Sequence, residues 1–353
     1  MTTSSATAAK TGILLLNMGG PDGPDSVKPF LYNLFSDPDI IRLPLSFLFQ
    51  KPLAFYISNK RGAEVRRNYG EMGGGSPILS FTQAQAEALG MELQQRGLTE
   101  TPVYIAMRYW HPFTAEAVDR IVQDGIQRLI VLPLYPHFSY TTTGSSLNAL
   151  RQELEARQVS LELALIPAYY QHPAYLAAMA DTIQEGLDSH QWSCPRDEVQ
   201  ILFSAHGLPL KHVKRMNDPY PEQIDATARQ VIRDFFPNNP WDICFQSQVG
   251  PLRWLGPYVE GALHYFAGKN VDNILMVAVS FVSDHVETLV EIDKLYLPLA
   301  KKLNITHCYR APALNTRPAF IQALATLVEP SLCQAHDNET AFSTAFPTLM
   351  QAQ

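Results

Sequence analysis

The sequence predicts a doubly wound α/β fold with two parallel sheets, one in each half of the chain. Three observations lead to this prediction. Seven short apolar runs have the continuous hydrophobicity of parallel strands that helices cover on both faces. Segments with helical periodicity alternate with these runs, as they do in βαβ units. A natural break near residues 168–173 divides the runs between two halves, which indicates two sheets.

The predicted elements follow one another in order along the chain. The expected strands are residues 12–18, 103–109, 128–135, 161–169, 199–206, 242–248 and 273–282. Apolar residues at helical spacing predict helices between them. The clearest of these are residues 80–97, 113–125 and 222–236, and a further helix is expected over residues 317–330.

The order of these elements predicts the domain organisation. We expect an N-terminal lobe over residues 11–168 and a C-terminal lobe over residues 169–312. A C-terminal helix within residues 313–330 is expected to pack back on the first lobe. The tails, residues 1–10 and 331–353, are predicted to be poorly ordered.

Composition excludes several classes of function. The chain has 353 residues, a net charge of −7 and no block of lysines or arginines, which argues against a nucleic-acid partner. Its four cysteines are scattered without a CxxC pair, which argues against a cysteine-ligated zinc or iron–sulfur site and fits a reducing, cytoplasmic compartment. No apolar window reaches the length of about 18 residues that a spanning helix needs.

One segment, residues 40–62, combines many apolar side chains with flanking Arg42, Lys51, Lys60 and Arg61. A buried helical hairpin is one interpretation. The other is an apolar, base-flanked lip that lies on lipid or admits a greasy substrate. The pattern alone does not decide between them.

Polar and aromatic residues gather where the predicted strands end, and ligands of open α/β sheets bind beyond those ends. The residues are Asn17-Met18, Arg108-Tyr109, Tyr135, His137, His206, residues 246–248 and Asp284-His285. Neither glycine cluster, "LNMGGPD" or "GGGSP", matches a phosphate-binding motif, so a nucleotide site is not expected.

The stretch "SFVSDHVETLVEID" (residues 280–293) carries an acidic pair. Asp284 followed by Glu287 has the spacing of a capping box, which predicts that a helix begins here. Glu287 and Glu291 are then four residues apart, where like charges destabilise a helix by about 0.2–0.5 kcal/mol. A solvated acidic face is the plain interpretation. The apolar residues around the pair favour a partly buried row that handles cations or protons.

His206, in "LFSAHGLP", has three interpretations. It could be a structural residue bonded to a nearby carbonyl, a metal ligand, or a general base. His137 and His285 follow other strands, but no pair of histidines has the close spacing that is typical of zinc sites. We favour a neutral imidazole that acts as a base, and leave metal ligation open.

Several stretches of the sequence resemble the ferrochelatases, in chain order from about residue 12 to about residue 320. They are "LLLNMGGPD", "YGEMGGGSPI", "MRYWHPFTAEAV", "YPHFSYTTTGSSLN", "FSAHGLP", "DPYP", "FQSQVGPLRWLGP" and "FVSDHVETLVEID". The resemblance implies two Rossmann-like lobes, each a four-stranded parallel sheet flanked by helices, with a porphyrin cleft between them. It also implies insertion of Fe²⁺ into protoporphyrin IX to give protohaem and two protons, the last step of haem biosynthesis.

The resemblance also assigns roles to residues of this chain. It implies that His206 and Glu287 are the catalytic pair, able to take a pyrrole proton or to contact the metal. It implies a proton or metal path along Asp284, His285 and Glu291. The residues implied to contact the porphyrin are Met18, Tyr69, Ser76, Arg108, Tyr109, Tyr135 and Trp254. Among these, Arg108 and Ser76 are expected to hold the propionates.

The resemblance implies no prosthetic group, since Fe²⁺ is a substrate. The tail has a single cysteine, so the iron–sulfur cluster of some family members is not expected. The implied partners are protoporphyrin IX and Fe²⁺, a membrane surface at residues 40–62, and neighbouring enzymes of the haem pathway. Two alternatives are weighed against this. One is a related chelatase that inserts cobalt or nickel into another tetrapyrrole, and the other is a two-lobed carrier that binds a tetrapyrrole or a metal without chemistry.

Overall fold

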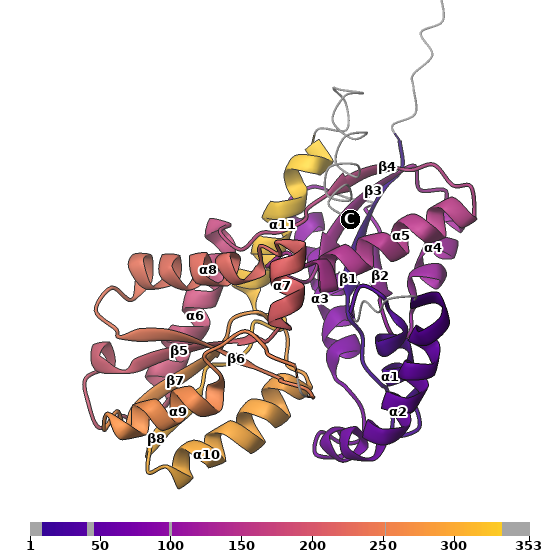
Figure 1. The fold of residues 1–353 in the computed structure, drawn as a ribbon. Helices are drawn as coiled ribbons and strands as arrows, with labels where there is room; N and C mark the ends of the chain where they lie inside the picture. The colour runs from indigo at the N-terminus through magenta and orange to yellow at the C-terminus, as the bar shows by residue number, and fades with distance from the viewer. Residues whose placement is uncertain (1–8, 41–45, 99–100, 251, 334–353) are drawn as a thin grey trace, which may run out of the picture.

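The computed structural model describes residues 9–40, 46–98, 101–250 and 252–333. Figure 1 shows two lobes side by side, each built on one sheet. The first sheet has the strand order β2-β1-β3-β4 and the second has the order β6-β5-β7-β8. All of the strand pairs are parallel. The prediction of two four-stranded parallel sheets flanked by helices is confirmed.

The strands lie close to their predicted positions. In the first lobe they are β1 (Thr11–Asn17), β2 (Val103–Met107), β3 (Arg128–Pro133) and β4 (Glu162–Leu165). In the second lobe they are β5 (Gln200–His206), β6 (Trp241–Gln246), β7 (Asn273–Ala278) and β8 (His307–Arg310). The sequence-based prediction of seven strands was wrong by one, because β8 has four half-buried residues with a polar character instead of an apolar run.

Helices connect the strands and cover both faces of each sheet. Those of the first lobe are α1 (Val27–Ser36), α2 (Ser46–Gly70), α3 (Ile78–Gln95), α4 (Thr114–Gln123), the π-helix η1 (Tyr140–Gly144) and α5 (Ser145–Ala156). Those that follow are α6 (Pro173–Ser189), the 3₁₀ turn η2 (Arg196–Glu198), α7 (Leu210–Met216), α8 (Tyr220–Phe235), α9 (Val259–Gly268), the π-helix η3 (Glu287–Tyr296), α10 (Leu297–Lys302) and α11 (Pro318–Cys333).

One apolar core runs through both lobes. It joins Ile13 of β1, Phe203 of β5 and Phe320 of α11, each of which is fully buried. Helix α11 contacts both α6 and α3, so the end of the described chain packs between the lobes. The predicted tails, residues 1–10 and 331–353, lie largely outside the described residues. A core shared in this way fixes the position of one sheet relative to the other.

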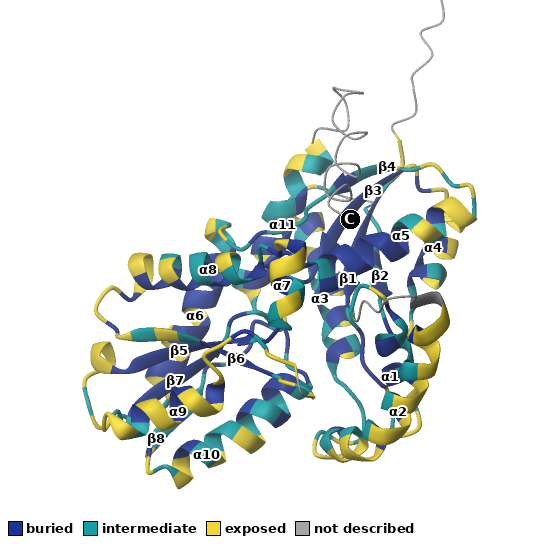
Figure 2. Ribbon diagram, in the orientation of Figure 1, coloured by how far each residue is buried: buried dark blue, intermediate teal, exposed yellow. Residues whose placement is uncertain are grey.

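The segment predicted as a hairpin or a lip belongs to one long helix from residue 46 onward. Helix α2 continues through Pro52 as far as Gly70, so the hairpin interpretation is wrong for the described residues, and residues 41–45 lie outside them. Its outer face is exposed in Figure 2, and Phe55 is 65% exposed. None of the helices that the structure describes is both long and apolar enough to span a bilayer.

The helix predicted from the capping box begins later than expected. It is the π-helix η3, which starts at Glu287 with Val286 as its N-cap residue. Asp284 does not cap it, because its carboxylate pairs with Arg310 at 3.1 Å and accepts hydrogen bonds from Thr288 and Asn315. Contacts from another part of the chain therefore overrode the local capping signal.

Candidate active site

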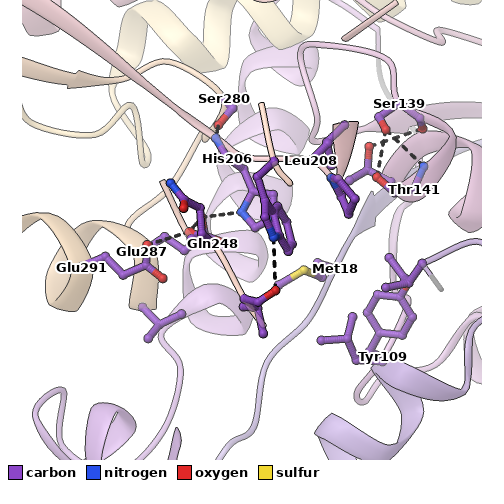
Figure 3. A pocket seen from close by; sticks show the side chains of 18 of the residues that line it. Met18, Tyr109, Ser139, Thr141, His206, Leu208, Gln248, Ser280, Glu287 and Glu291 are labelled. Atoms are coloured by element: carbon purple, nitrogen blue, oxygen red, sulfur yellow. Dashed lines mark hydrogen bonds and ion pairs between the residues drawn. The ribbon is translucent and has the colours of Figure 1, made fainter. Parts of the chain in front are cut away.

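A cavity of about 1770 Å³ lies between the lobes, where strands of both sheets end. Met18, directly after β1, and His206, the last residue of β5, both line it. In Figure 3 the side chains of Met18 and Tyr109 lie across the cavity from His206 and Glu287. β1 and β5 hold the same place in the two strand orders, so the ends of corresponding strands contribute to this one cavity.

His206 and Glu287 form the centre of the second-lobe wall. The His206 Nδ1 atom is 2.8 Å from Glu287 Oε2. The His206 side chain is 37% exposed, whereas the Glu287 side chain is 10% exposed. Burial opposes the imidazolium, but the Glu287 carboxylate outweighs it and raises the pKa of His206. Burial likewise opposes the carboxylate, yet His206 holds the pKa of Glu287 well below its ordinary value.

Glu291 lies one turn further along η3 and shares a hydroxyl with Glu287. The Ser247 Oγ atom is 2.8 Å from Glu287 Oε2 and 2.6 Å from Glu291 Oε2. A serine hydroxyl has one hydrogen, so it can donate to only one of these carboxylates. The second contact is a hydrogen bond only if one carboxyl is protonated. Burial, followed by the charge of Glu287, raises the pKa of Glu291 to about 7, so Glu291 is the carboxyl group that exchanges a proton near neutral pH.

His285 stands on the other side of Glu287. Its Nδ1 atom is 3.1 Å from the Ser283 carbonyl, which fixes the hydrogen on Nδ1 and directs Nε2 toward Glu287 Oε1 at 3.8 Å. Its side chain is buried and lines the cavity. Asp284, predicted to belong to the same path, is not among the described residues that line the cavity, and its carboxylate serves the ion pair with Arg310.

The first-lobe wall is built around a buried carboxylate that sequence reasoning missed. Asp37 Oδ2 lies 3.0 Å from Arg108 Nη2 and accepts hydrogen bonds from the hydroxyls of Tyr109 and Ser145. Arg108 Nε also donates to Ser145 Oγ at 2.7 Å. The charge of Arg108 is therefore already compensated inside the protein. Asp37 has no motif around it, and its partners are 71 to 108 positions away in the sequence.

The other predicted pocket residues divide into two groups. Tyr69, Tyr135 and Trp254 line the cavity. Ser76 is not among the described lining residues, because it packs against the turn at Gly20, where an added Cβ would lie 2.6 Å from the Ser76 Cβ. The structure thus brings together every predicted site residue except Ser76 and Asp284.

Two further features of the second-lobe wall were not predicted in their present roles. Ser247 adopts a left-handed backbone conformation with φ of 65°, which a non-glycine residue seldom takes. Gln246 donates from Nε2 to the Glu287 carbonyl and to Glu291 Oε2. Across the described ranges, no three His, Cys, Asp or Glu side chains are arranged to hold a metal ion together. The wall thus consists of two imidazoles, two carboxyl groups and the polar groups that hydrogen-bond to them.

Comparison with known proteins connects this site with a family. A family model described as Ferrochelatase matches residues 10–332. A ferrochelatase of Synechocystis sp. is 49% identical over 327 residues, which cover 92% of this chain and 83% of the relative. A ferrochelatase of Gloeothece citriformis is 48% identical over 329 residues, with the same two coverages.

Two solved structures share the fold at low identity. CbiX, described as the terminal enzyme for biosynthesis of siroheme in denitrifying bacteria, has a TM-score of 0.51 and 14% identity, and the match covers 91% of this chain and 99% of that one. SirB from Bacillus subtilis with Fe³⁺ has a TM-score of 0.52 and 11% identity, and the match covers 92% and 97% of the two chains. These likenesses show the two-lobed fold alone.

Proposed function

This chain belongs to the ferrochelatase family, which inserts iron into a porphyrin in haem synthesis, and we propose that His206 and Glu287 are the base that removes the pyrrole protons. The observation that carries the proposal is the 2.8 Å contact between His206 Nδ1 and Glu287 Oε2. In the neutral form of His206, with Glu287 ionised, the ring hydrogen lies on Nδ1 and the lone pair lies on Nε2. Nε2 is therefore the atom that accepts a proton from a porphyrin bound in the cavity.

Glu291 is the proposed next acceptor of the proton, after the pair of His206 and Glu287. Glu291, with a pKa of about 7, can gain and lose a proton near neutral pH. Its contact with Glu287 through Ser247 gives a short route away from the cavity. We place His285 on the same route because its Nε2 atom faces Glu287. Asp284 belongs to this proposal only through the hydrogen bond that it accepts from Thr288 in the first turn of η3.

We propose that iron contacts the second-lobe wall once the pyrrole nitrogens have lost their protons. An imidazole nitrogen and a carboxylate are both suitable ligands for ferrous iron, so His206 and Glu287 are the proposed metal contacts on this side of the ring. On the other side, Met18 and Tyr109 face the macrocycle. We propose that the ring lies between these two walls, with Tyr69, Tyr135 and Trp254 supplying the apolar and aromatic lining.

The propionates of protoporphyrin IX need cations that are not already paired. Arg108 is compensated by Asp37, and Ser76 does not line the cavity, so neither is well suited to the role expected from the sequence. The cavity is also lined by basic side chains on both lobes, namely Lys60, Arg61, Lys211, Lys214, Arg215 and Arg253. We propose that cations of this set hold the two carboxylates.

The base is tested by anaerobic turnover with protoporphyrin and Fe²⁺, followed by haem absorbance. We expect His206→Ala to lower kcat by about 10³-fold while porphyrin still binds, as measured by quenching of protein fluorescence. His111→Ala is the matched control, because His111 forms an exposed pair with Glu116 at the same 2.8 Å distance. Undiminished turnover in His206→Ala would overturn the assignment, and an inactive parent protein would overturn the proposed function.

A membrane surface is the proposed partner of α2. Leu48, Phe49, Phe55 and Tyr56 are each more than half exposed on this helix, and Lys51 and Lys60 lie beside them. Apolar side chains flanked by cations suit an anionic lipid surface. We expect flotation with anionic liposomes, and loss of flotation in the triple variant Leu48→Ser, Phe49→Ser, Phe55→Ser. Binding that survives this change would show that α2 is not the contact.

We further propose that the protein works in the cytoplasm, in contact with neighbouring enzymes of the haem pathway and without an iron–sulfur cluster. The cysteines support the last point. Cys244 is buried in the second-lobe core and bonded to the Phe203 carbonyl, where it cannot meet Cys194, Cys308 and Cys333 around a cluster without unfolding. Iron and sulfide analysis of the purified protein tests this, and stoichiometric acid-labile sulfide would refute it.

A further inference from the structure

A loop of the first lobe is hydrogen-bonded to the first half of α8 in the second lobe. His137 Nε2 lies 2.9 Å from Thr227 Oγ1, and the Phe138 amide donates to Gln223 Oε1 at 2.7 Å. The loop follows β3, and its residues His137, Ser139 and Thr141 line the cavity. These contacts join one wall of the cavity to an element of the opposite lobe.

Asp218 is a buried carboxylate at this contact between the lobes. The residue is 2% exposed. Oδ2 accepts the Ser139 hydroxyl at 2.8 Å and the Tyr140 amide at 3.0 Å, both from the first lobe. Oδ1 accepts the Tyr220 amide at 3.0 Å, at the first residue of α8. Three donors from two lobes thus converge on a single buried carboxylate, and hydrogen bonds to such a group are stronger than neutral ones.

Tyr220 extends this contact to the proposed base. Its hydroxyl donates to the carbonyl of His206 at 3.0 Å. The His206 amide is held from the other side by Ser280 Oγ, also at 3.0 Å. The backbone that carries the imidazole is therefore fixed through the same residue that Asp218 holds at the start of α8.

We propose that Asp218 is a positioning residue that sets the distance between the two walls of the cavity. It is bonded directly to Ser139 on the first-lobe wall and, through Tyr220, to His206 on the second-lobe wall. A rigid planar macrocycle contacts both walls at once, so its affinity depends on this distance, whereas a small cation does not need both walls. The proposal rests on the proposed function for the identity of this ligand.

The substitution Asp218→Asn tests the proposal with little change of volume. The new amide can still accept from Tyr220 and donate to Ser139, but its NH₂ group then faces the Tyr140 amide, so one hydrogen bond is lost. We expect the Kd and the KM for protoporphyrin to rise about tenfold, the value that corresponds to one hydrogen bond to a charged group. The KM for Fe²⁺ is expected to stay within about twofold. A general loss of folded protein would instead lower kcat and leave both KM values unchanged, so a rise in the porphyrin KM alone separates the two cases.

Asp225→Asn is the matched control, because Asp225 is on the same helix and pairs with Arg229 at the exposed surface. Ser139→Ala removes a single donor to Asp218 and is measured in parallel, so that a failure of Asp218→Asn to fold still leaves a test. Thermal unfolding reports stability separately. If the folded variants bind protoporphyrin as tightly as the parent, or if both KM values rise together, the proposal is wrong. Parent protein that binds porphyrin with the predicted Asp218 dependence but does not turn over would refute the function and leave the positioning role intact.

Discussion

Replacing Glu287 with glutamine separates the charge of this residue from its shape. The glutamine Oε1 atom can still accept the hydrogen bond from His206 Nδ1, so the tautomer that leaves Nε2 free is retained. The lost component is the negative charge, which is the main factor that raises the pKa of His206 against the effect of burial. The variant therefore tests whether His206 acts as a base whose strength is set by Glu287.

The expected size of the effect follows from the geometry. A general base contributes about 10²–10⁴ to a rate, and a weaker base contributes less. The imidazole remains, and because the His206 side chain is 37% exposed, solvent screens part of the lost attraction. We therefore expect kcat to fall by roughly 10²-fold, at the lower end of the range.

The pH profile of kcat/KM shows in which direction the pKa of His206 changes in this variant. A base must be neutral to accept a proton, so kcat/KM rises with pH as His206 loses its own proton. In the parent the pKa of His206 is raised, so this rise occurs above the ordinary range of histidine. Without the Glu287 charge the pKa falls, and the rising limb moves to lower pH. Anaerobic turnover from pH 5.5 to 9 measures this, and a limb that stays in place or moves to higher pH would refute the reasoning.

Three substitutions test the scaffold by urea unfolding. Asp37→Ala leaves Arg108 without its buried partner, so we expect the free energy of unfolding to fall by about 3 kcal/mol. A loss under about 1 kcal/mol would show that water replaces the carboxylate. Gly207→Ala places a Cβ 2.8 Å from the Gln246 carbonyl oxygen, with an expected cost of about 1–3 kcal/mol, and unchanged stability would mean that this backbone can move apart. Phe320→Ala empties the core between the lobes at a cost of about 3–5 kcal/mol, and a smaller cost would argue against a shared core.

The sequence located β1 and β3 well because each is a continuous apolar run, whereas β4 ends four residues before its predicted end at 169 and has one buried residue, Ala164. β1 and β3 are buried along nearly their whole length, so their sequences are short unbroken apolar runs without the polar positions that a helix with one exposed face would show. β8 was missed because its four residues are all half-buried at the edge of its sheet. Edge strands pack on one neighbour only, so their side chains carry a weaker signal.

The site residues that could be predicted are those whose reactive side chains stand at a strand end or share one helix. His206 stands at the end of β5, and Glu287 and Glu291 share one helix, so local sequence was sufficient to single them out. Asp37 was not predictable, because only the fold brings it to Arg108 and Ser145. Ser247 was passed over for a similar reason, since its importance comes from its place between two carboxyl groups that another segment supplies.

The difference between the two walls of the cavity has a consequence for the direction of proton release. The strand orders match, so Met18 and His206 are at equivalent places in the two lobes, yet their surroundings differ. On the first-lobe wall the charges of Arg108 and Asp37 cancel within one hydrogen-bonded group. On the second-lobe wall Glu287 and Glu291 lie beside His206, and within the described part of the chain no ion pair joins either carboxyl group to an arginine or lysine, so these two groups can attract a proton. A proton leaving a ring between these walls is drawn toward the second lobe, which is where the base stands.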